Sequence, residues 1–385
     1  MLDTAPPDHL ARAEALLPRF RDRAATWDRE RRYCHANVED LTRAGLMGMT
    51  IPEAYGGPGL PLTEVVRIVE AVSGACTLTG RVLVEGNMGA LSAVMAYGTE
   101  AQKHRAARLV LAGDKPAICI TEPGAGSDAT AMTTRAMQVP GGWRLDGIKH
   151  WITGGGVSKL HLIFAQTPDG IRGFLAEGGD GLRVARLERT MGLCGMPEAE
   201  LHIENLFVGD DMVIPDAGFG ALMDAYNTQR VGAATIALGV AAGAARLAAE
   251  YLQEREQFGR SLAEFQGLQW MLADMDTEIH AARLMIQDAA TTERFPDRVK
   301  AARAKLMTSE MAVRVVDRAL QMFGARGYGG ETPLERMYRD VRMFTIGGGT
   351  AQVLRNQIAG HVLGRRLHQT RHGFDAPDRS DIAAQ

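Results

Sequence analysis

The sequence predicts an α+β chain in which one sheet domain separates two helical domains. Residues 8 to about 113 carry apolar side chains at helical spacing, as in HLARAEALLPRFRDRAATWDRE and LTEVVRIVEAV. From residue 116 to about 214 the pattern changes to short β-rich runs separated by Gly and Asp turns. Helical periodicity then returns in long segments from about residue 217. This order is typical of a chain with a central β domain.

The domain boundaries follow from these changes of pattern. We expect an N-terminal α-helical domain over residues 1–115, a central β domain over 116–214, a C-terminal α-helical domain over 215–368 and a polar tail over 369–385. The strands expected in the central β domain are WRLDGIKHWI, LHLIFAQ, IRGFLAE, GLRVARLE and AELHIENLFV. The long helices expected in the C-terminal α-helical domain are TQRVGAATIALGVAAGAARLAAEYLQEREQF, FQGLQWMLADMDTEIHAARLMIQDAATTE and DRVKAARAKLMTSEMAVRVVDRALQMFGARG.

Composition narrows the class of protein. Of the 385 residues, 46% are hydrophobic and 23% charged, which are ordinary values for a globular protein. A net charge of −3 without a basic run argues against nucleic acid binding. No secretory signal is evident, and the most apolar stretch, Ala233–Ala249, looks too short and too weakly hydrophobic to span a bilayer. We therefore expect a cytoplasmic protein without a membrane partner.

Cysteine and histidine spacing gives no sign of a metal site. The four cysteines lie far apart without a CxxC pair, which excludes a zinc ribbon and gives no reason to expect disulfides. The 10 histidines form no HxH or HxxxH cluster with acidic neighbours. We expect no bound metal.

Two short segments carry groups suited to a ligand. ITEPGAGSD offers the hydroxyls of Thr121 and Ser127 and free backbone N–H groups around Gly124–Gly126, which suit an anion or the edge of a flavin. In KHWITGG, Trp151 and Thr153 are two residues apart, so on a strand they share one face. Each residue taken singly also has a structural explanation, because a lone Gly-rich turn or a buried Trp usually belongs to the scaffold.

Four segments together resemble the acyl-CoA dehydrogenase family, namely ITEPGAGSD, KHWITGG, REQFGRSLAEFQ and QMFGARGYGGETPLERMYRDVRMF. They occur in the family's order and at its spacing, and the resemblance runs over nearly the whole chain. It implies an N-terminal helical domain, a central β-barrel-like domain and a C-terminal four-helix bundle. It also implies FAD as cofactor, a CoA thioester as substrate and a homo-oligomer, commonly a tetramer.

The same resemblance implies which residues hold FAD. Thr153 corresponds to the hydroxyl that donates near flavin N5, and Trp151 to the ring that packs on the flavin. The positions that hold the pyrophosphate and adenine from a neighbouring subunit correspond to Arg255, Phe258, Gln266, Gln321 and Gly324. The closing turn corresponds to Thr350 and Gln352, and the set is completed by Ile118, Ile120, Thr121 and Ser127.

The chain departs from the family at the catalytic base. Removing the α-proton of a thioester calls for a positioned carboxylate. In the family this glutamate stands either before the Gly-Thr of the last motif or on the long helix before an arginine. Here IGGGT has Gly348 at the first position, and AYNTQRVGAA has Gln229 before Arg230 at the second. Because an amide does not accept a proton at useful pH, the sequence predicts a site without the carboxylate base.

Three explanations account for Gln229. It could be an engineered replacement of glutamate, the mark of a non-catalytic paralogue, or the natural residue of an enzyme that avoids α-proton removal. The third is favoured because GDKPAICITEP, KHWITGGGVSKLHLIFA, AYNTQRVGA, REQFGRSLAEFQGLQWM and MFTIGGGTAQVLR are similar to the 3-sulfinopropionyl-CoA desulfinase branch of the family. That resemblance implies release of sulfite from 3-sulfinopropionyl-CoA to give propionyl-CoA, without net redox chemistry.

An anionic substrate needs a cation, and Arg81 in ACTLTGRVLVEGNMGAL is the candidate. The desulfinase branch carries an arginine at this position, and a guanidinium fork matches two sulfinate oxygens. The alternative is that Arg81 pairs with Glu85 one turn later, although Arg before Glu is the poorer orientation for such a pair.

The expected mechanism assigns each group a role. Arg81 anchors the sulfinate, the backbone N–H of Gly348 polarises the thioester carbonyl, and Gln229 orients a water or the thioester. Ser127 and Arg230 help to bind the substrate. The sequence does not identify the proton donor. The alternatives are a short-chain acyl-CoA dehydrogenase or enoyl-CoA reductase with a displaced base, and a non-catalytic flavoprotein that binds acyl-CoA.

Overall fold

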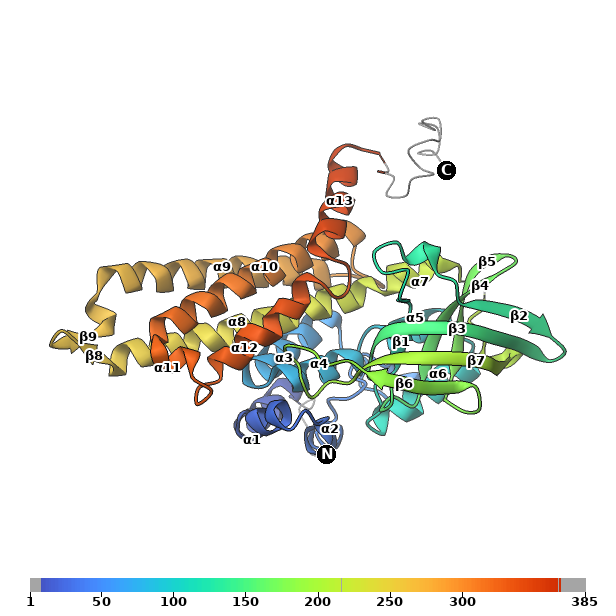
Figure 1. Cartoon of the computed structure of the whole chain (residues 1–385), viewed down its shortest axis with the longest axis horizontal. Coiled ribbons are helices and arrows are strands. Elements are labelled where there is room, and N and C mark those ends of the chain that lie inside the picture. Colours follow the sequence, from blue (N-terminus) through green and yellow to red (C-terminus); the bar gives the residue numbers. More distant parts are fainter. Residues whose placement is uncertain (1–7, 216, 366, 368–385) are drawn as a thin grey trace, which may run out of the picture.

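The computed structural model describes residues 8–215, 217–365 and 367. The polar tail expected over residues 369–385 lies outside this part of the chain. Helices open and close the described chain and a sheet stands between them, as the periodicities predict (Figure 1).

The N-terminal helices divide between two clusters: α1–α4 pack with the C-terminal helices, whereas α5 and α6 share a hydrophobic cluster with the sheet (Figure 1). The apolar residues of α3 recur at helical spacing and are buried, Val65, Val69 and Val72 among them, and this face of α3 packs against α8. α6 begins with a capping box between Thr99 and Gln102. The helices are α1 (His9–Arg29), α2 (His35–Arg43), α3 (Leu62–Ala75), α4 (Thr77–Glu85), α5 (Ala90–Tyr97) and α6 (Glu100–Leu111).

The central part of the chain is a seven-stranded sheet in the order β1-β4-β2-β3-β7-β6, with β5 paired to the other side of β4. β1 and β4 run parallel, whereas the long strands β3 and β7 are antiparallel neighbours. The strands are β1 (Ala117–Cys119), β2 (Arg135–Val139), β3 (Gly142–Thr153), β4 (His161–Thr167), β5 (Gly170–Ala176), β6 (Leu182–Leu187) and β7 (Glu198–Gly209).

Three long helices dominate the C-terminal part, and a two-stranded hairpin joins the first two at the far end from the sheet (Figure 1). The shorter α12 and α13 pack on the third, α10. The elements are α7 (Phe219–Ala225), α8 (Asn227–Glu254), β8 (Glu256–Gln257), β9 (Arg260–Ser261), α9 (Gln266–Ala290), α10 (Arg298–Phe323), α11 (Ala325–Tyr328), α12 (Leu334–Val341) and α13 (Ala351–Val362).

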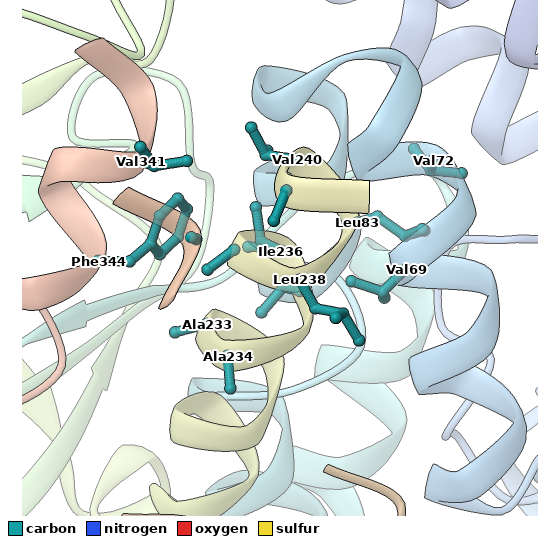
Figure 2. Close-up of a cluster of buried hydrophobic side chains, with 14 of the residues drawn as sticks. Val69, Val72, Leu83, Ala233, Ala234, Ile236, Leu238, Val240, Val341 and Phe344 are labelled. Atoms are coloured by element: carbon teal, nitrogen blue, oxygen red, sulfur yellow. The ribbon is translucent and has the colours of Figure 1, made fainter. Parts of the chain in front are cut away.

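The Ala- and Gly-rich α8 forms the centre of the hydrophobic core. Figure 2 shows Ile236, Leu238 and Val240 of α8 between α3 and α4 on one side and Val341 and Phe344 on the other. Small residues permit this approach, because a Cβ on Gly239 would lie 2.3 Å from the backbone oxygen of Glu70 on α3.

The most apolar helical segment is a core segment of the protein. The expectation that it is too short and too weakly hydrophobic to span a bilayer is wrong, since the helical stretch Phe219–Glu254 passes a length and composition test for a membrane span. However, 78% of the most apolar 18 residues of this stretch are buried inside the protein. Its apolarity is therefore explained by packing against the surrounding helices.

Candidate active site

The candidate site lies where the three parts of the chain meet. α4 contributes its last turn, α8 its first turn, β3 its last residue and β7 its first residue, and the Gly-rich turn over residues 347–349 comes from the segment before α13. These ends converge because α8 packs on α4, and because β3 and β7 pair directly at Thr153 and Glu198.

Arg81 projects from α4 into a set of polar groups. Its guanidinium lies 3.0 Å from Oε1 of Glu85 and donates over 3.1 Å to the hydroxyl of Thr153. The side chain is only 12% exposed. The pairing with Glu85 that the sequence left as the alternative is therefore present, in spite of its less favourable orientation along the helix. Thr153 links the same guanidinium to the residues expected to hold the flavin.

Gln229 lies in the first turn of α8 and is also bound to Glu85. Its Nε2 donates to Glu85 Oε1 over 2.8 Å, and both residues are 4% exposed. Gly89 makes room for the amide, because a Cβ at that glycine would lie 2.8 Å from Gln229 Oε1. One oxygen of Glu85 thus joins two of the residues that the sequence singled out, Arg81 and Gln229.

Glu198 is a site residue that the sequence analysis missed. The hydroxyl of Thr153 lies 3.0 Å from each of its carboxylate oxygens. Burial raises the pKa of Glu198 to about 7, against the opposing effects of Arg81 and the Thr153 hydroxyl. A carboxyl group with this pKa can donate or accept a proton near neutral pH.

The expectation of a site without a carboxylate needs a correction. Neither family position holds one, since residues 229 and 348 are Gln and Gly. However, packing brings Glu85 and Glu198 into the same cluster, each one hydrogen bond from a predicted site residue. The spacing of Arg81 and Glu85 along α4 marked Glu85 as a possible partner of Arg81. Only the packing of α4 on α8 and the pairing of β3 with β7 bring Glu85 to Gln229 and Glu198 to Thr153.

The turn over residues 347–349 is held by two cations. Arg230 donates to the backbone oxygen of Gly348 over 3.4 Å, and Lys305 on α10 donates to that of Gly349 over 2.6 Å. Both glycines have positive φ, +75° and +99°. Burial, together with Arg230 and Arg81 nearby, lowers the pKa of Lys305 to about 7. The sequence analysis missed Lys305 because it lies within a regular helical pattern.

Space remains where the family's glutamate would stand. A Cβ on Gly348 would meet nothing nearer than the Tyr226 hydroxyl at 3.9 Å and the Lys305 Cε at 4.0 Å. Within the described residues, neither Arg230 nor Lys305 forms an ion pair with a carboxylate. This part of the site therefore presents positive charge, which suits an anionic or strongly polarised ligand.

A second group of predicted residues lies along β1 and β3. Trp151 is 51% exposed and its φ of +57° marks a bulge in the pairing of β3 with β7. Ile152 is buried and Thr153 is partly buried. Because the bulge interrupts the alternation of side chains here, the shared face of Trp151 and Thr153 stays a prediction. The remaining members of this group are Ile118 and Ile120, which are partly buried, Thr121, which is half-buried, and Ser127, which is exposed.

A buried ion pair holds the Thr121–Ser127 loop against β3. Lys149 donates over 2.8 Å to Glu122, which also accepts from the backbone of Thr133 and Thr134. These bonds lower the pKa of Glu122 to about 2 in spite of its burial. The pair was missed by the sequence analysis, although both residues lie inside its quoted motifs.

Five of the other predicted cofactor residues lie at the end of the long helices that is far from the sheet. The hairpin β8–β9 and α11 stand at the far end of the long helices from β3 (Figure 1). Phe258 in this hairpin is 92% exposed and has a φ of +57°. Exposed residues at this end include Arg255, Gln266, Gln321 and Gly324, whereas Thr350 and Gln352 lie at the start of α13. One chain therefore does not bring the two groups together.

A cluster of His150, Glu188 and Glu200 brings possible metal ligands within 4.8 Å of one another, an arrangement that the histidine spacing did not reveal. Arg186 already forms ion pairs with both carboxylates, at 2.7 Å and 3.0 Å. These contacts account for the cluster as a salt-bridge network on the sheet.

The residues on β1 and β3 fit a flavin. An exposed indole with a positive φ next to a hydroxyl provides both a stacking surface and a hydrogen-bonding group. A Cβ on Gly124 or Gly126 would meet nothing within 4 Å, so the loop backbone is open to a ligand.

Fold and site together define the class: the chain belongs to the acyl-CoA dehydrogenase family. The patterns of the family's N-terminal, middle and C-terminal domains match residues 13–114, 117–206 and 216–363. A 3-sulfinopropanoyl-CoA desulfinase of Paraburkholderia xenovorans is 53% identical over 371 residues, which are 93% of this chain and 94% of the relative. The short-chain-specific acyl-CoA dehydrogenase of Clostridium acetobutylicum is 36% identical, over 88% and 92% of the two chains.

A solved structure gives the same result for the fold. The glutaryl-CoA dehydrogenase of Mycobacterium smegmatis in complex with FADH2 superposes with a TM-score of 0.90 at 23% identity, covering 96% of this chain and 97% of that one. The predicted family and the predicted order of helical, sheet and helical domains are confirmed.

Proposed function

We propose that this chain is a desulfinase that converts 3-sulfinopropanoyl-CoA and water into propanoyl-CoA and sulfite. The observation that carries the proposal is the amide of Gln229, which donates to Glu85 at the position where the resemblance to the family implies the catalytic glutamate. The identity of 53% to a desulfinase, against 36% to a dehydrogenase, supports it.

The reaction balances without an oxidant. The carbon–sulfur bond breaks, its electron pair stays on carbon, and one proton forms the new C–H bond. The sulfur leaves as SO₂, which takes up water to give hydrogen sulfite and a proton. Bound flavin supplies a redox-active aromatic ring, but this overall reaction is redox-neutral and needs no electron acceptor.

Arg81 is the residue that we assign to the sulfinate. Its guanidinium is nearly buried, and its Nε lacks a hydrogen-bond partner among the described residues. A sulfinate that accepts from Arg81 gains charge-assisted bonds in a poorly hydrated site. The backbone N–H of Gly348 polarises the thioester carbonyl, while Ser127 and Arg230 help to bind the rest of the substrate.

The proton comes from a group that titrates near neutral pH. Glu198 and Lys305 both have a pKa of about 7, and they lie next to Thr153 and to Gly349, respectively. We assign the donor role to Glu198, because it shares Thr153 with Arg81 and thus lies at the proposed sulfinate site.

FAD is the cofactor that we propose, in a site shared between two chains. Trp151, Thr153, Thr121, Ser127, Ile118 and Ile120 would hold the flavin in one chain, and a neighbouring chain would supply Arg255, Phe258, Gln266, Gln321 and Gly324, with Thr350 and Gln352 closing the site. The distance between the two groups along the long helices, seen in Figure 1, supports an oligomer, and we propose a homotetramer. The slightly acidic net charge argues against a nucleic acid partner, and we propose a cytoplasmic enzyme.

The test is anaerobic incubation with 3-sulfinopropanoyl-CoA, with sulfite measured by its cleavage of an aromatic disulfide, which releases a coloured thiolate. We expect sulfite in proportion to propanoyl-CoA without added electron acceptor and without loss of the oxidised flavin absorbance. Sulfite release that requires an acceptor, or no release at all, would contradict the proposal.

Glu198 supports a second candidate, an acyl-CoA dehydrogenase or enoyl-CoA reductase with a displaced base. A carboxyl with a pKa of about 7 is able to take an α-proton. Anaerobic mixing with butanoyl-CoA distinguishes the two, because only this candidate bleaches the oxidised flavin. Tight binding of CoA esters with neither response would identify a non-catalytic binding protein.

A further inference from the structure

Glu85 occupies a position between the two residues that set this chain apart from a dehydrogenase. Its Oε1 forms an ion pair with Arg81 at 3.0 Å and accepts a hydrogen bond from Gln229 over 2.8 Å, although Gln229 lies 144 residues further along the chain. The carboxylate is 4% exposed, so water scarcely competes for these bonds.

This contact fixes the orientation of the Gln229 amide. An ionised carboxylate only accepts hydrogen bonds, so the amide turns its Nε2 towards Glu85 and its Oε1 away from it. Within the described residues, Gln229 Oε1 and Arg81 Nε are both buried without a hydrogen-bond partner. Both residues held by Glu85 thus keep one polar atom, an acceptor and a donor, that a bound ligand can use.

A glutamate at position 229 is incompatible with this arrangement. It would bring a second carboxylate within about 2.8 Å of Glu85 in a buried site, where two like charges cannot both be ionised. The other charged and titratable groups facing Glu85 are Tyr33, Lys115, Glu198 and Tyr226, and Arg81 already pairs with it.

We infer that Glu85 is a positioning residue that makes an amide necessary at position 229 and holds Arg81 and Gln229 towards the substrate. The identity of residue 229 is therefore determined jointly with residue 85. The pairing itself rests on the geometry, and only its catalytic consequence rests on the proposed desulfinase function.

The experiment is a cycle of four proteins: the natural chain, Gln229→Glu, Glu85→Gln and the double variant in which the two side chains are exchanged. Gln253→Glu, on the exposed end of α8, is the matched control. Thermal unfolding is followed at about pH 5.5, where residues 85 and 229 of Gln229→Glu would share a proton, and at about pH 8, where both carboxyls would be charged. Sulfite release gives kcat and KM.

We expect Gln229→Glu to lower the Tm more at the higher pH, because a pair that must share a proton is destabilised as that proton is lost. The exchange restores a single carboxylate facing a single amide, so its Tm should return close to that of the natural chain at both pH values. In kcat/KM we expect a loss of at least about tenfold for Gln229→Glu and recovery of most of it on exchange. Gln253→Glu should change neither.

An equal Tm for Gln229→Glu and the natural chain at both pH values would overturn the inference, as would a double variant no better than the sum of the single ones. If Gln229→Glu fails to fold, folding of the double variant supports the inference and its failure overturns it. The pH dependence of Tm is independent of the reaction, so a chain that releases no sulfite would refute the proposed function and leave the pairing to be judged by unfolding alone.

Discussion

Thr153 and Glu198 face each other across the antiparallel pair of β3 and β7, with the Thr153 hydroxyl 3.0 Å from both carboxylate oxygens. The same hydroxyl accepts from Arg81. A chain of polar contacts therefore runs from Glu198 through Thr153, Arg81 and Glu85 to Gln229, in which the Arg81–Glu85 link is an ion pair and the other links are hydrogen bonds. It connects the residues expected at the flavin with those expected at the acyl group. A change of charge at one end therefore alters the strength of the polar contacts at the other.

Replacing Glu198 by Gln tests the group that titrates near neutral pH. The pKa of Glu198 rises from 4.5 to about 7 on folding. Its contribution to the free energy of unfolding is therefore fully present below pH 4.5 and is lost as the pH rises towards 7. We expect the Tm of Glu198→Gln to decline less than that of the natural chain across this window. Sulfite release should fall by about 10²-fold and lose its pH dependence near 7. Glu254→Gln, at the exposed end of α8, is the control, and identical pH profiles for Glu198→Gln and the natural chain would refute the assignment.

Arg81→Lys tests the sulfinate anchor. Lysine keeps the charge but loses the planar fork, and it does not reach Glu85, Thr153 and a ligand together. We expect kcat/KM for 3-sulfinopropanoyl-CoA to fall by about 10- to 100-fold, whereas the Kd of propanoyl-CoA, which lacks the anion, changes by less than about threefold. Calorimetry with both thioesters measures the difference. Arg67→Lys on the exposed face of α3 is the control, and equal losses for both ligands would show that Arg81 acts only on the scaffold.

Complementation between chains tests the shared flavin site. If Trp151 and Phe258 contact the same flavin from different chains, Trp151→Ser and Phe258→Ser should each lower the flavin-to-protein ratio. In an oligomer that contains both variants, some sites combine the natural Trp151 of one chain with the natural Phe258 of the other. Such oligomers should therefore regain part of the bound flavin. The ratio of flavin to protein absorbance after co-expression measures this recovery. Phe207→Ser, which removes another exposed aromatic side chain, should leave the ratio unchanged. A monomeric holoenzyme, or variants that never complement, would contradict the prediction.

Glu122→Gln tests the Lys149–Glu122 ion pair that holds the Thr121–Ser127 loop against β3. Removing one partner leaves the fully buried Lys149 charge uncompensated, which costs about 3–5 kcal/mol. The pKa of Glu122 falls from 4.5 to about 2 on folding, so its stabilisation is present above pH 4.5 and is lost as the pH falls towards 2. The variant should therefore have a lower free energy of unfolding at neutral pH and a flatter profile in acid. Denaturant titrations measure both, with the exposed Arg183–Glu204 pair, altered by Glu204→Gln, expected to change the free energy by less than about 1 kcal/mol. A neutral effect of Glu122→Gln would show that the loop is held by its backbone alone.

The sequence by itself determined the order of helices and strands. The predicted helical runs beginning at Thr228, Phe265 and Asp297 correspond to α8, α9 and α10 within a few residues at most ends. The periodicity of these runs depends only on residues that are neighbours in the sequence. The same holds for the motifs that identified the family and for the absence of glutamate at positions 229 and 348.

Only the tertiary structure decided what surrounds those positions. Glu85 meets Gln229 because α4 packs on α8, and Glu198 meets Thr153 through the register of β3 with β7. Whether a carboxyl is a partner, a proton donor or a spectator depends on its burial and its neighbours in space, and these are set by contacts between residues far apart in the chain. The sequence therefore offered Glu85 only as a possible partner of Arg81, and it gave no sign of Glu198.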